Sequence, residues 1–266
     1  MEHRDLTVVA IYGNGDGSQA IPALKHSVDQ LSGSWGLLLS TERPADLPPD
    51  IVWEKIGALS YQQYSVFVMH SLHSFIKTDY CLIVQDDGWV LDGKNFTPNY
   101  YKYDYIGAPC HAAIVGNELQ LGFAWRDNPE RIVIQNGGFS LRSKRFLEAP
   151  NKYGLTHIPT KDQALWNEDV QLTGIYRPIL EVYGIKFAPE SVAKQFAIEY
   201  LAPTFHDDLD FTRLVGHHAF SRKLVSADHV VVDAQSLESY REPDVLAHFQ
   251  NLEYTIEYVA RDSAQA

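Results

Sequence analysis

The stretch Tyr80-Cys81-Leu82-Ile83-Val84-Gln85-Asp86-Asp87-Gly88 runs from an apolar segment straight into two adjacent acids and a glycine. The apolar part predicts a buried strand, and the acids then lie at its carboxyl end. Open α/β sheets bind their ligands at that edge. Two neighbouring carboxylates repel each other, and a cation relieves the repulsion. The stretch therefore indicates a divalent ion that carries a phosphorylated ligand, with a solvated Asp-Gly turn as the alternative.

The same kind of apolar run recurs through the amino-terminal half of the chain. Strands are predicted at 6–12, 35–40 and 80–84, and helices at 21–31 and 60–77, where apolar residues recur at helical spacing. Alternation of strands and helices is typical of a parallel sheet covered by helices. The sequence therefore predicts an α/β fold with a mixed, mostly parallel sheet flanked by helices, in a single domain.

The carboxyl-terminal half gives shorter and less regular signals. A strand at 103–109 is expected to enter a turn, and a short strand at 131–134 is expected to end at Gln135-Asn136-Gly137-Gly138. Glycines have no Cβ, so this pair either lets a ligand approach the backbone or marks a bulge. Asn167 is expected to cap a helix over 170–183, which would be kinked or ended near Pro178.

The composition limits the classes of function. The 266 residues carry a formal net charge of −12, which argues against nonspecific nucleic-acid binding and against a general attraction to anionic lipid. The two cysteines are too few for a disulfide framework, so a reducing cytoplasm is expected. No apolar run approaches the ~20 residues of a membrane span, and any membrane contact would be peripheral.

Two further motifs carry groups that are suited to chemistry. Glu168-Asp169 stands near a predicted helix start, where the acids either complement the helix dipole or supply a general base. Gly216-His217-His218 offers imidazoles, which are common metal ligands although a single histidine is more often structural. A carboxylate together with an imidazole suits Mn²⁺ better than Ca²⁺.

The order of these motifs resembles that of GT-A glycosyltransferases. Their sequences resemble those of a bacterial family that is known as a domain of unknown function and is related to those enzymes. The matching strings lie between Leu6 and Phe220. They are Gln85-Asp86-Asp87 as a Gln-x-Asp motif, Tyr103-Asp104-Tyr105-Ile106-Gly107-Ala108-Pro109, Asn136-Gly137-Gly138-Phe139-Ser140-Leu141-Arg142, Glu168-Asp169-Val170, and Gly216-His217-His218 as a Gly-x-His motif. The resemblance implies a GT-A, Rossmann-like fold, although the chain departs from the strict Asp-x-Asp of many GT-A enzymes.

The resemblance also implies roles for individual residues. Asp87 and His218 match metal ligands and would hold Mn²⁺ or Mg²⁺. Asp169, or its neighbour Glu168, matches the catalytic base. The residues expected around the nucleotide-sugar donor, some of them at the ends of the first two strands, are Tyr12, Glu42, Arg43, Gln85, Asp86, Asn136, Gly137 and Gly138.

These roles define an expected function. The protein would be a metal-dependent glycosyltransferase of polysaccharide biosynthesis, which moves a sugar from a nucleotide-diphosphate donor, a UDP-sugar, to a hydroxyl of a glycan or glycolipid acceptor with inversion. It would act in the cytoplasm or at the inner face of the membrane. Residues 1–220 would form the catalytic domain, with a nucleotide-binding half at 1–90 and an acceptor-binding half at 91–220, and residues 221–266 an extension packed on it.

Two other functions stay open from the residues alone. A metal-dependent hydrolase of nucleotide-sugars or phosphoesters would use the same acids to activate water. A noncatalytic carbohydrate-binding protein would fit the aromatic content of 12%, but such modules are commonly all-β, which the alternation of strands and helices does not favour.

Overall fold

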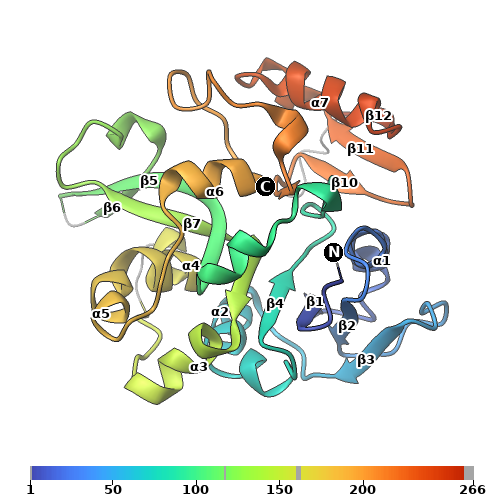
Figure 1. Cartoon of the computed structure of the whole chain (residues 1–266), viewed down its shortest axis with the longest axis horizontal. Coiled ribbons are helices and arrows are strands. Elements are labelled where there is room, and N and C mark those ends of the chain that lie inside the picture. Colours follow the sequence, from blue (N-terminus) through green and yellow to red (C-terminus); the bar gives the residue numbers. More distant parts are fainter. Residues whose placement is uncertain (1, 117, 160–162, 261–266) are drawn as a thin grey trace.

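The computed structural model describes residues 2–116, 118–159 and 163–260. The centre of the fold is a seven-stranded sheet (Figure 1). In sheet order the strands are β3 (Ile51–Lys55), β2 (Trp35–Ser40), β1 (Leu6–Tyr12), β4 (Tyr80–Ile83), β7 (Ile132–Ser143), β5 (Tyr105–Val115) and β6 (Glu118–Leu121). The first four are parallel, and the last three are joined by antiparallel pairing. Because β5 again points the same way as β4, the prediction of a mixed, mostly parallel sheet is confirmed.

Helices cover both faces of the sheet, as predicted. Alternate residues of β1 point to opposite faces. Val8 shares a buried cluster with Leu24 of α1, whereas Val9 shares one with Val68 of α2. Burying such a side chain contributes roughly 1.5–3 kcal/mol, so the two faces together fix the orientation of the strand. The covering helices are α1 (Ile21–Gln30) and α6 (Glu190–Phe196) on one face and α2 (Tyr61–His70) and α3 (Lys144–Tyr153) on the other.

The helix predicted at 60–77 is shorter than expected. α2 begins after Ser60, whose hydroxyl accepts the backbone N–H of Gln63 at 3.3 Å while the Gln63 side chain accepts the backbone N–H of Ser60 at 2.8 Å. This reciprocal capping box satisfies two free donors of the first turn. The helix ends at His70, and a short 3-10 turn, Leu72–Ser74, carries the chain on toward β4.

The two predicted strands of the second half are longer than expected. β5 passes Pro109 without turning, because a bulge between Gly107 and Pro109 absorbs the residue that lacks a backbone donor. The side chain of Gln135 accepts the N–H of Gly107 at 3.1 Å and so replaces a ladder contact there. β7 likewise continues through the glycine pair as far as Ser143. The predictions of a turn at 109 and of a strand end at 135–138 are therefore wrong.

The helix expected over 170–183 is broken into three pieces. They are α4 (Glu168–Val170), a π-helical turn (Gln171–Ile175) and α5 (Arg177–Val182). Asn167 occupies the cap position but makes no capping hydrogen bond, since its side-chain oxygen accepts the hydroxyl of Tyr61 at 2.7 Å.

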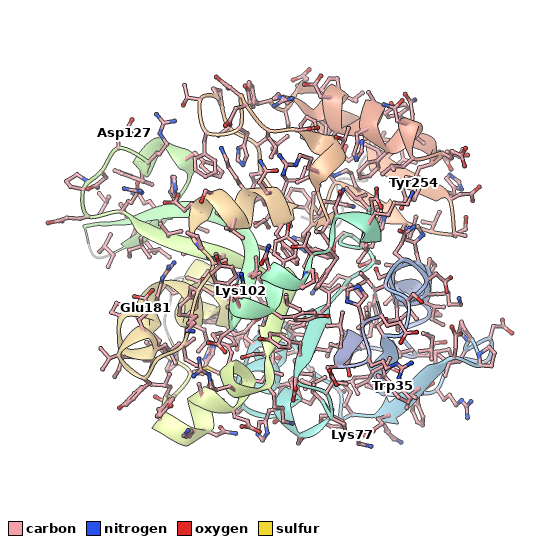
Figure 2. All side chains as sticks on the ribbon, in the orientation of Figure 1. Trp35, Lys77, Lys102, Asp127, Glu181 and Tyr254 are labelled. Carbon is pink, nitrogen blue, oxygen red and sulfur yellow. The ribbon has the colours of Figure 1, made fainter. Side chains whose placement is uncertain are left out.

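The carboxyl-terminal residues form a second layer that packs on the first. Its elements are β10 (Arg222–Leu224), β11 (His229–Asp233), α7 (Glu242–Asn251) and β12 (Thr255–Val259), and Figure 1 shows them beside α1. The fully buried Trp89 donates its indole N–H to the hydroxyl of Tyr254 at 3.1 Å, and Figure 2 labels Tyr254 within this layer. Over the described residues, no helix combines the length and apolarity needed to cross a bilayer.

Candidate active site

The acidic turn that follows β4 is held by the carboxyl-terminal part of the chain. Its two ends, Gln85 and Gly88, exchange backbone hydrogen bonds of 2.9 and 3.0 Å, so the two acids occupy the tip. Ala219 donates its backbone N–H to the carbonyl of Asp87 at 2.8 Å. A short strand pair, β8 (Ala197–Ile198) and β9 (Gly216–His217), leads directly into this contact. The late histidine, His218, is thereby placed beside the acids.

The imidazole of His218 is the centre of the polar contacts. Its Nε2 lies 3.0 Å from Gln85 Oε1 and 3.3 Å from Asp87 Oδ1. Its Nδ1 lies 3.3 Å from Glu199 Oε1 and 3.3 Å from Asn136 Nδ2. Asp87 Oδ1 is buried and accepts no hydrogen bond, because its contact with His218 has the distance of an ion pair but not the alignment of a hydrogen bond.

The charges of this cluster set its protonation. Burial alone lowers the pKa of His218, but the carboxylates of Asp87 and Glu199 outweigh burial and raise the pKa to about 10. Burial alone raises the pKa of Asp87, yet His218 outweighs it and holds that pKa below its usual range. A metal ion that binds His218 must therefore displace its proton.

The glycine pair in β7 makes room for site side chains. A Cβ at Gly138 would lie 2.3 Å from His218 Nε2 and 2.8 Å from Gln85 Oε1. A Cβ at Gly137 would lie 2.8 Å from Glu168 Oε1. Real Cβ atoms essentially never approach so closely, so a side chain at either position would displace the site side chains that it meets. The structure thus gives a reason for the two glycines that the sequence did not indicate. The side chains of the site pack directly against the backbone of the strand at these positions.

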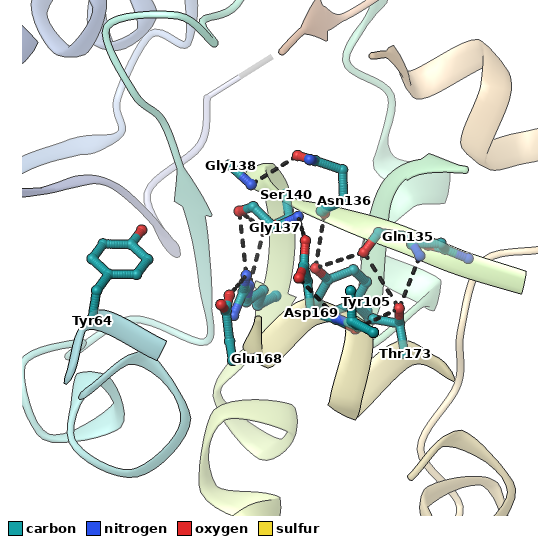
Figure 3. Close-up of polar contacts among 12 residues, drawn as sticks. Tyr64, Tyr105, Gln135, Asn136, Gly137, Gly138, Ser140, Glu168, Asp169 and Thr173 are labelled. Atoms are coloured by element: carbon teal, nitrogen blue, oxygen red, sulfur yellow. Dashed lines mark hydrogen bonds and ion pairs between the residues drawn. The ribbon is translucent and has the colours of Figure 1, made fainter. Parts of the chain in front are cut away.

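The adjacent acids Glu168 and Asp169 have different partners (Figure 3). The fully buried guanidinium of Arg142, on β7, donates to Glu168 Oε1 at 2.8 Å. Asp169 Oδ2 instead accepts the backbone N–H of Gly137 at 2.8 Å. Burial first, and then the charge of Glu168, raise the pKa of Asp169 to about 7. A carboxyl group that exchanges its proton near neutrality has the property required of a general base.

One cavity at this edge of the sheet collects most of the residues that the sequence singled out. Its volume of about 720 Å³ lies within the roughly 300–1,000 Å³ of small-molecule sites. The predicted residues that line it are Gln85, Asp87, Asn136, Gly137, Gly138, Glu168, Asp169 and His218. The predicted residues that do not line it are Tyr12, Glu42, Arg43 and Asp86.

Asp86 lies in a different environment from Asp87. Its carboxylate forms an ion pair with Lys223 Nζ of β10 at 3.1 Å. The pKa of Tyr12, at the end of β1, is raised by burial first and then by the charge of Asp86. Asp86, Lys223 and Tyr12 therefore form a small charged group next to the main cavity, at the carboxyl ends of β1 and β4.

Glu42 and Arg43 lie exposed in the loop after β2. Their neighbour Thr41 donates its N–H and its hydroxyl to the carbonyl of Gly15, at 3.2 and 2.7 Å. The loops after β1 and β2 thus lie side by side, as expected for two parallel strands. The structure does not bring Glu42 or Arg43 into the cavity of Asp87 and Asp169.

Several residues of the site were not found from the sequence. Glu199 is a lone acid after a two-residue strand, and only the pairing of β8 with β9 brings it to His218. Tyr64 has the spacing of a core residue in α2, yet its hydroxyl accepts the side-chain N–H of Gln85 at 3.1 Å. Tyr61 and Tyr200 also line the cavity. No local pattern distinguishes these residues from ordinary loop or helix positions.

The donor set fits a divalent ion. Asp87 Oδ1 and His218 Nε2 supply the oxygen and nitrogen that Mn²⁺ accepts, and the oxygen has no hydrogen bond of its own. Glu199 lies at the other imidazole nitrogen, where a carboxylate commonly orients a metal-binding histidine. Within residues 2–116, 118–159 and 163–260, no three His, Cys, Asp or Glu side chains are grouped as a complete metal site. A metal here would therefore also need ligands from a bound phosphate or water.

The chain belongs to the family described as "Protein of unknown function (DUF5672)", whose model matches residues 54–218. This match confirms the expected relation to a family of unknown function, and it includes the acidic turn, the glycine pair and His218. No curated protein matches the chain.

Two solved structures show a distant likeness. The galactosyltransferase LgtC, in complex with donor and acceptor sugar analogs, is 11% identical with a TM-score of 0.43, and the match covers 81% of this chain and 87% of that one. An active-site mutant of LgtC is 12% identical with a TM-score of 0.44 and the same coverage. At these scores the likeness is too distant to assign a function.

Proposed function

We propose that the protein is a metal-dependent glycosyltransferase that uses a nucleotide-diphosphate sugar. The observation that carries the proposal is one cavity that joins the pair Asp87 and His218 to a carboxyl group of near-neutral pKa, Asp169. The cavity lies at the carboxyl edge of the sheet, where α/β folds bind ligands. A cation for the departing diphosphate and a base for the acceptor hydroxyl are the two groups that the proposed inverting transfer uses.

The cation would be Mn²⁺ or Mg²⁺, held by Asp87 Oδ1 and His218 Nε2. Bound there, it would offset the negative charge of the departing diphosphate. Glu199, 3.3 Å from Nδ1, would orient the imidazole. The metal would take the place of the proton on Nε2, which lies 3.0 Å from Gln85 Oε1 in the structure.

Asp169 would take the proton from the acceptor hydroxyl as that oxygen attacks the anomeric carbon. A positioned base contributes about 10²–10⁴-fold in rate. Glu168 would be a positioning residue, because its carboxylate is already paired with the buried Arg142. Direct attack with a base on the acceptor side predicts inversion at the anomeric carbon.

The donor would lie across the carboxyl ends of β1, β2 and β4 and beside the middle of β7. The uridine of a UDP-sugar would border Tyr12 and the loop with Glu42 and Arg43, and Asp86 would contact the ribose or sugar. The sugar itself would lie beside Asn136 and the glycine pair. Residues 1–90 would thus bind the nucleotide and 91–220 the acceptor, a glycan or glycolipid, in the cytoplasm or at the inner face of the membrane.

The test is a panel of nucleotide-sugars with and without Mn²⁺, read by thermal unfolding and by donor turnover. We expect one donor to raise the melting temperature only with the metal, and its turnover to require a saccharide acceptor. Acceptor-independent release of free sugar would instead indicate the hydrolase. Absence of any donor effect, together with saccharide binding, would indicate a noncatalytic carbohydrate-binding protein.

A further inference from the structure

A second cavity, of about 430 Å³, adjoins the first. The two cavities share Glu199, Tyr200 and Phe220, so these residues form the boundary between them. The other walls come mainly from the carboxyl-terminal layer, around β10 and the 3-10 helix Ala234–Glu238. A ligand long enough to pass the boundary would contact both cavities at once.

Two buried, oppositely charged side chains of this cavity are incompletely hydrogen-bonded. Arg222 is 1% exposed and Glu242 is 6% exposed, and Arg222 Nη1 lies 3.4 Å from Glu242 Oε2. Among the residues that the structure describes, Arg222 Nε and Glu242 Oε1 have no hydrogen-bond partner. Leaving such groups unpaired is costly. A ligand hydroxyl in this cavity can accept from a guanidinium and donate to a carboxylate.

The boundary residues present aromatic rings. Tyr200 is 51% exposed and Phe220 is 50% exposed, and their ring centroids lie 6.4 Å apart. Large exposed rings beside a polar cavity offer apolar area next to hydrogen-bonding groups. A sugar ring has the matching surface, with C–H groups on its faces and hydroxyls around its edge.

The charges of the cavity favour a neutral ligand. Glu199, Asp233 and Glu242 line it with one guanidinium, that of Arg222. Glu199 is also paired with His218, which still leaves two carboxylates for one cation. A phosphate or carboxylate on the ligand would meet net repulsion.

We propose that the second cavity binds a neutral sugar unit of the acceptor, adjacent to the unit that reacts in the first cavity. The acceptor is then a saccharide of at least two units, with the boundary rings between them. This inference rests on the proposed function, because it names the acceptor of the same site.

The test compares Ser239→Trp, at the exposed rim of the second cavity, with Ser226→Trp, on an exposed turn that lines neither cavity. The full chain and both variants are bound to an array of neutral and acidic mono-, di- and trisaccharides. We expect the wild-type protein and Ser226→Trp to bind neutral glycans of two or more units at least tenfold better than monosaccharides. Ser239→Trp should lose that preference while melting at the same temperature.

Hydrogen exchange gives a second readout that needs no substitution. Neutral glycans bound by the wild-type protein should slow amide exchange in residues 234–239 and around Tyr200. Equal glycan binding by Ser239→Trp, a preference for acidic glycans, or no binding of neutral glycans of two or more units would overturn the inference. If glycans bind as expected but no nucleotide-sugar does, the second cavity stands and the proposed transfer reaction fails.

Discussion

At the level of single residues, the two members of each adjacent acidic pair have different partners. Asp86 pairs with Lys223, whereas Asp87 lies at His218. The same division holds for the second acidic pair, in which one carboxylate meets a buried guanidinium and the other accepts the backbone N–H groups of Gly137 and Val170. In each pair, the acid without a lysine or arginine partner among the described residues is the one to which the proposed reaction gives a direct role.

The protonation of Asp169 predicts the pH dependence of transfer. Its pKa of about 7 means that the carboxylate needed as a base is lost as the pH falls below neutrality, so kcat/KM should rise with pH up to about 7 and then level off. Asp169→Asn should retain nucleotide binding and lose transfer by about 10²–10⁴-fold.

The measurement is the pH–rate profile of the wild-type protein and of the variant. The exposed Asp46→Asn serves as the matched control and should be as active as the wild type. A flat profile between pH 5 and 8, or an active Asp169→Asn, would remove Asp169 from the role of base.

The pairing of Glu168 with Arg142 predicts a large effect on stability. Glu168→Gln leaves a buried guanidinium without a counter-charge, which typically costs about 3–5 kcal/mol in the free energy of unfolding. Glu181→Gln removes an exposed helix pair with Arg177 and should cost far less. Urea unfolding of both variants measures the difference. Equal stability of the two would mean that Glu168 is free to act in catalysis.

At the scale of elements, strand geometry decides how the site is built. β7 carries its glycines through the middle of a continuous strand, and the imidazole of His218 occupies the space over Gly138. Gly138→Ala should therefore push the imidazole away from Asp87, because the added Cβ would lie 2.3 Å from His218 Nε2. We expect metal-dependent nucleotide binding to fall at least tenfold.

Gly57→Ala is the matched control for that substitution, since nothing lies within 4 Å of its added Cβ. Calorimetric titration of nucleotide with Mn²⁺ into both variants measures the effect. Unchanged binding by Gly138→Ala would show that the position of His218 does not depend on the glycine.

The sequence predicted the elements whose burial is uniform and missed those that depend on distant contacts. β1 and β4 were predicted because their apolar runs are continuous. β3 was not predicted, since it is a short edge strand with an exposed Val52 and follows a proline-rich loop. The length of β5 was underestimated because Pro109 looks like a strand end until the bulge is known.

The candidate site was also predicted in part: residues within sequence motifs were predicted, and residues placed by distant contacts were not. Residues that belong to recognisable sequence motifs, such as Asp87 and His218, line one cavity. Glu199 could not be predicted, since its place depends on the β8–β9 pair and on no local pattern. Which acid of each pair has a cation partner also follows only from the fold, through Arg142 and Lys223.

At the scale of the whole molecule, the carboxyl-terminal layer completes the site. Trp89, next to the acidic turn, is covered by Phe249 and Tyr254. Leu224 donates its backbone N–H to the carbonyl of Asp86 at 2.9 Å. Residues 221–266 are therefore expected to be an extension that the catalytic part needs.

Removal of residues 221–266 should prevent stable folding, because it exposes the buried cluster around Trp89. The intact chain should unfold in one transition seen alike by calorimetry and by tryptophan fluorescence. A shortened chain with an unchanged melting temperature would show instead that the extension is an independent unit.

The central claim is that Asp87 and His218 hold a divalent ion that binds a nucleotide diphosphate. It is tested most directly by calorimetric titration of UDP, GDP and dTDP into the wild-type protein and into Asp87→Asn, with and without Mn²⁺. We expect one nucleotide to bind the wild-type protein at least tenfold more tightly with Mn²⁺, and we expect Asp87→Asn to lose this gain. Nucleotide binding that is the same with and without Mn²⁺, or that is unchanged in Asp87→Asn, would contradict it.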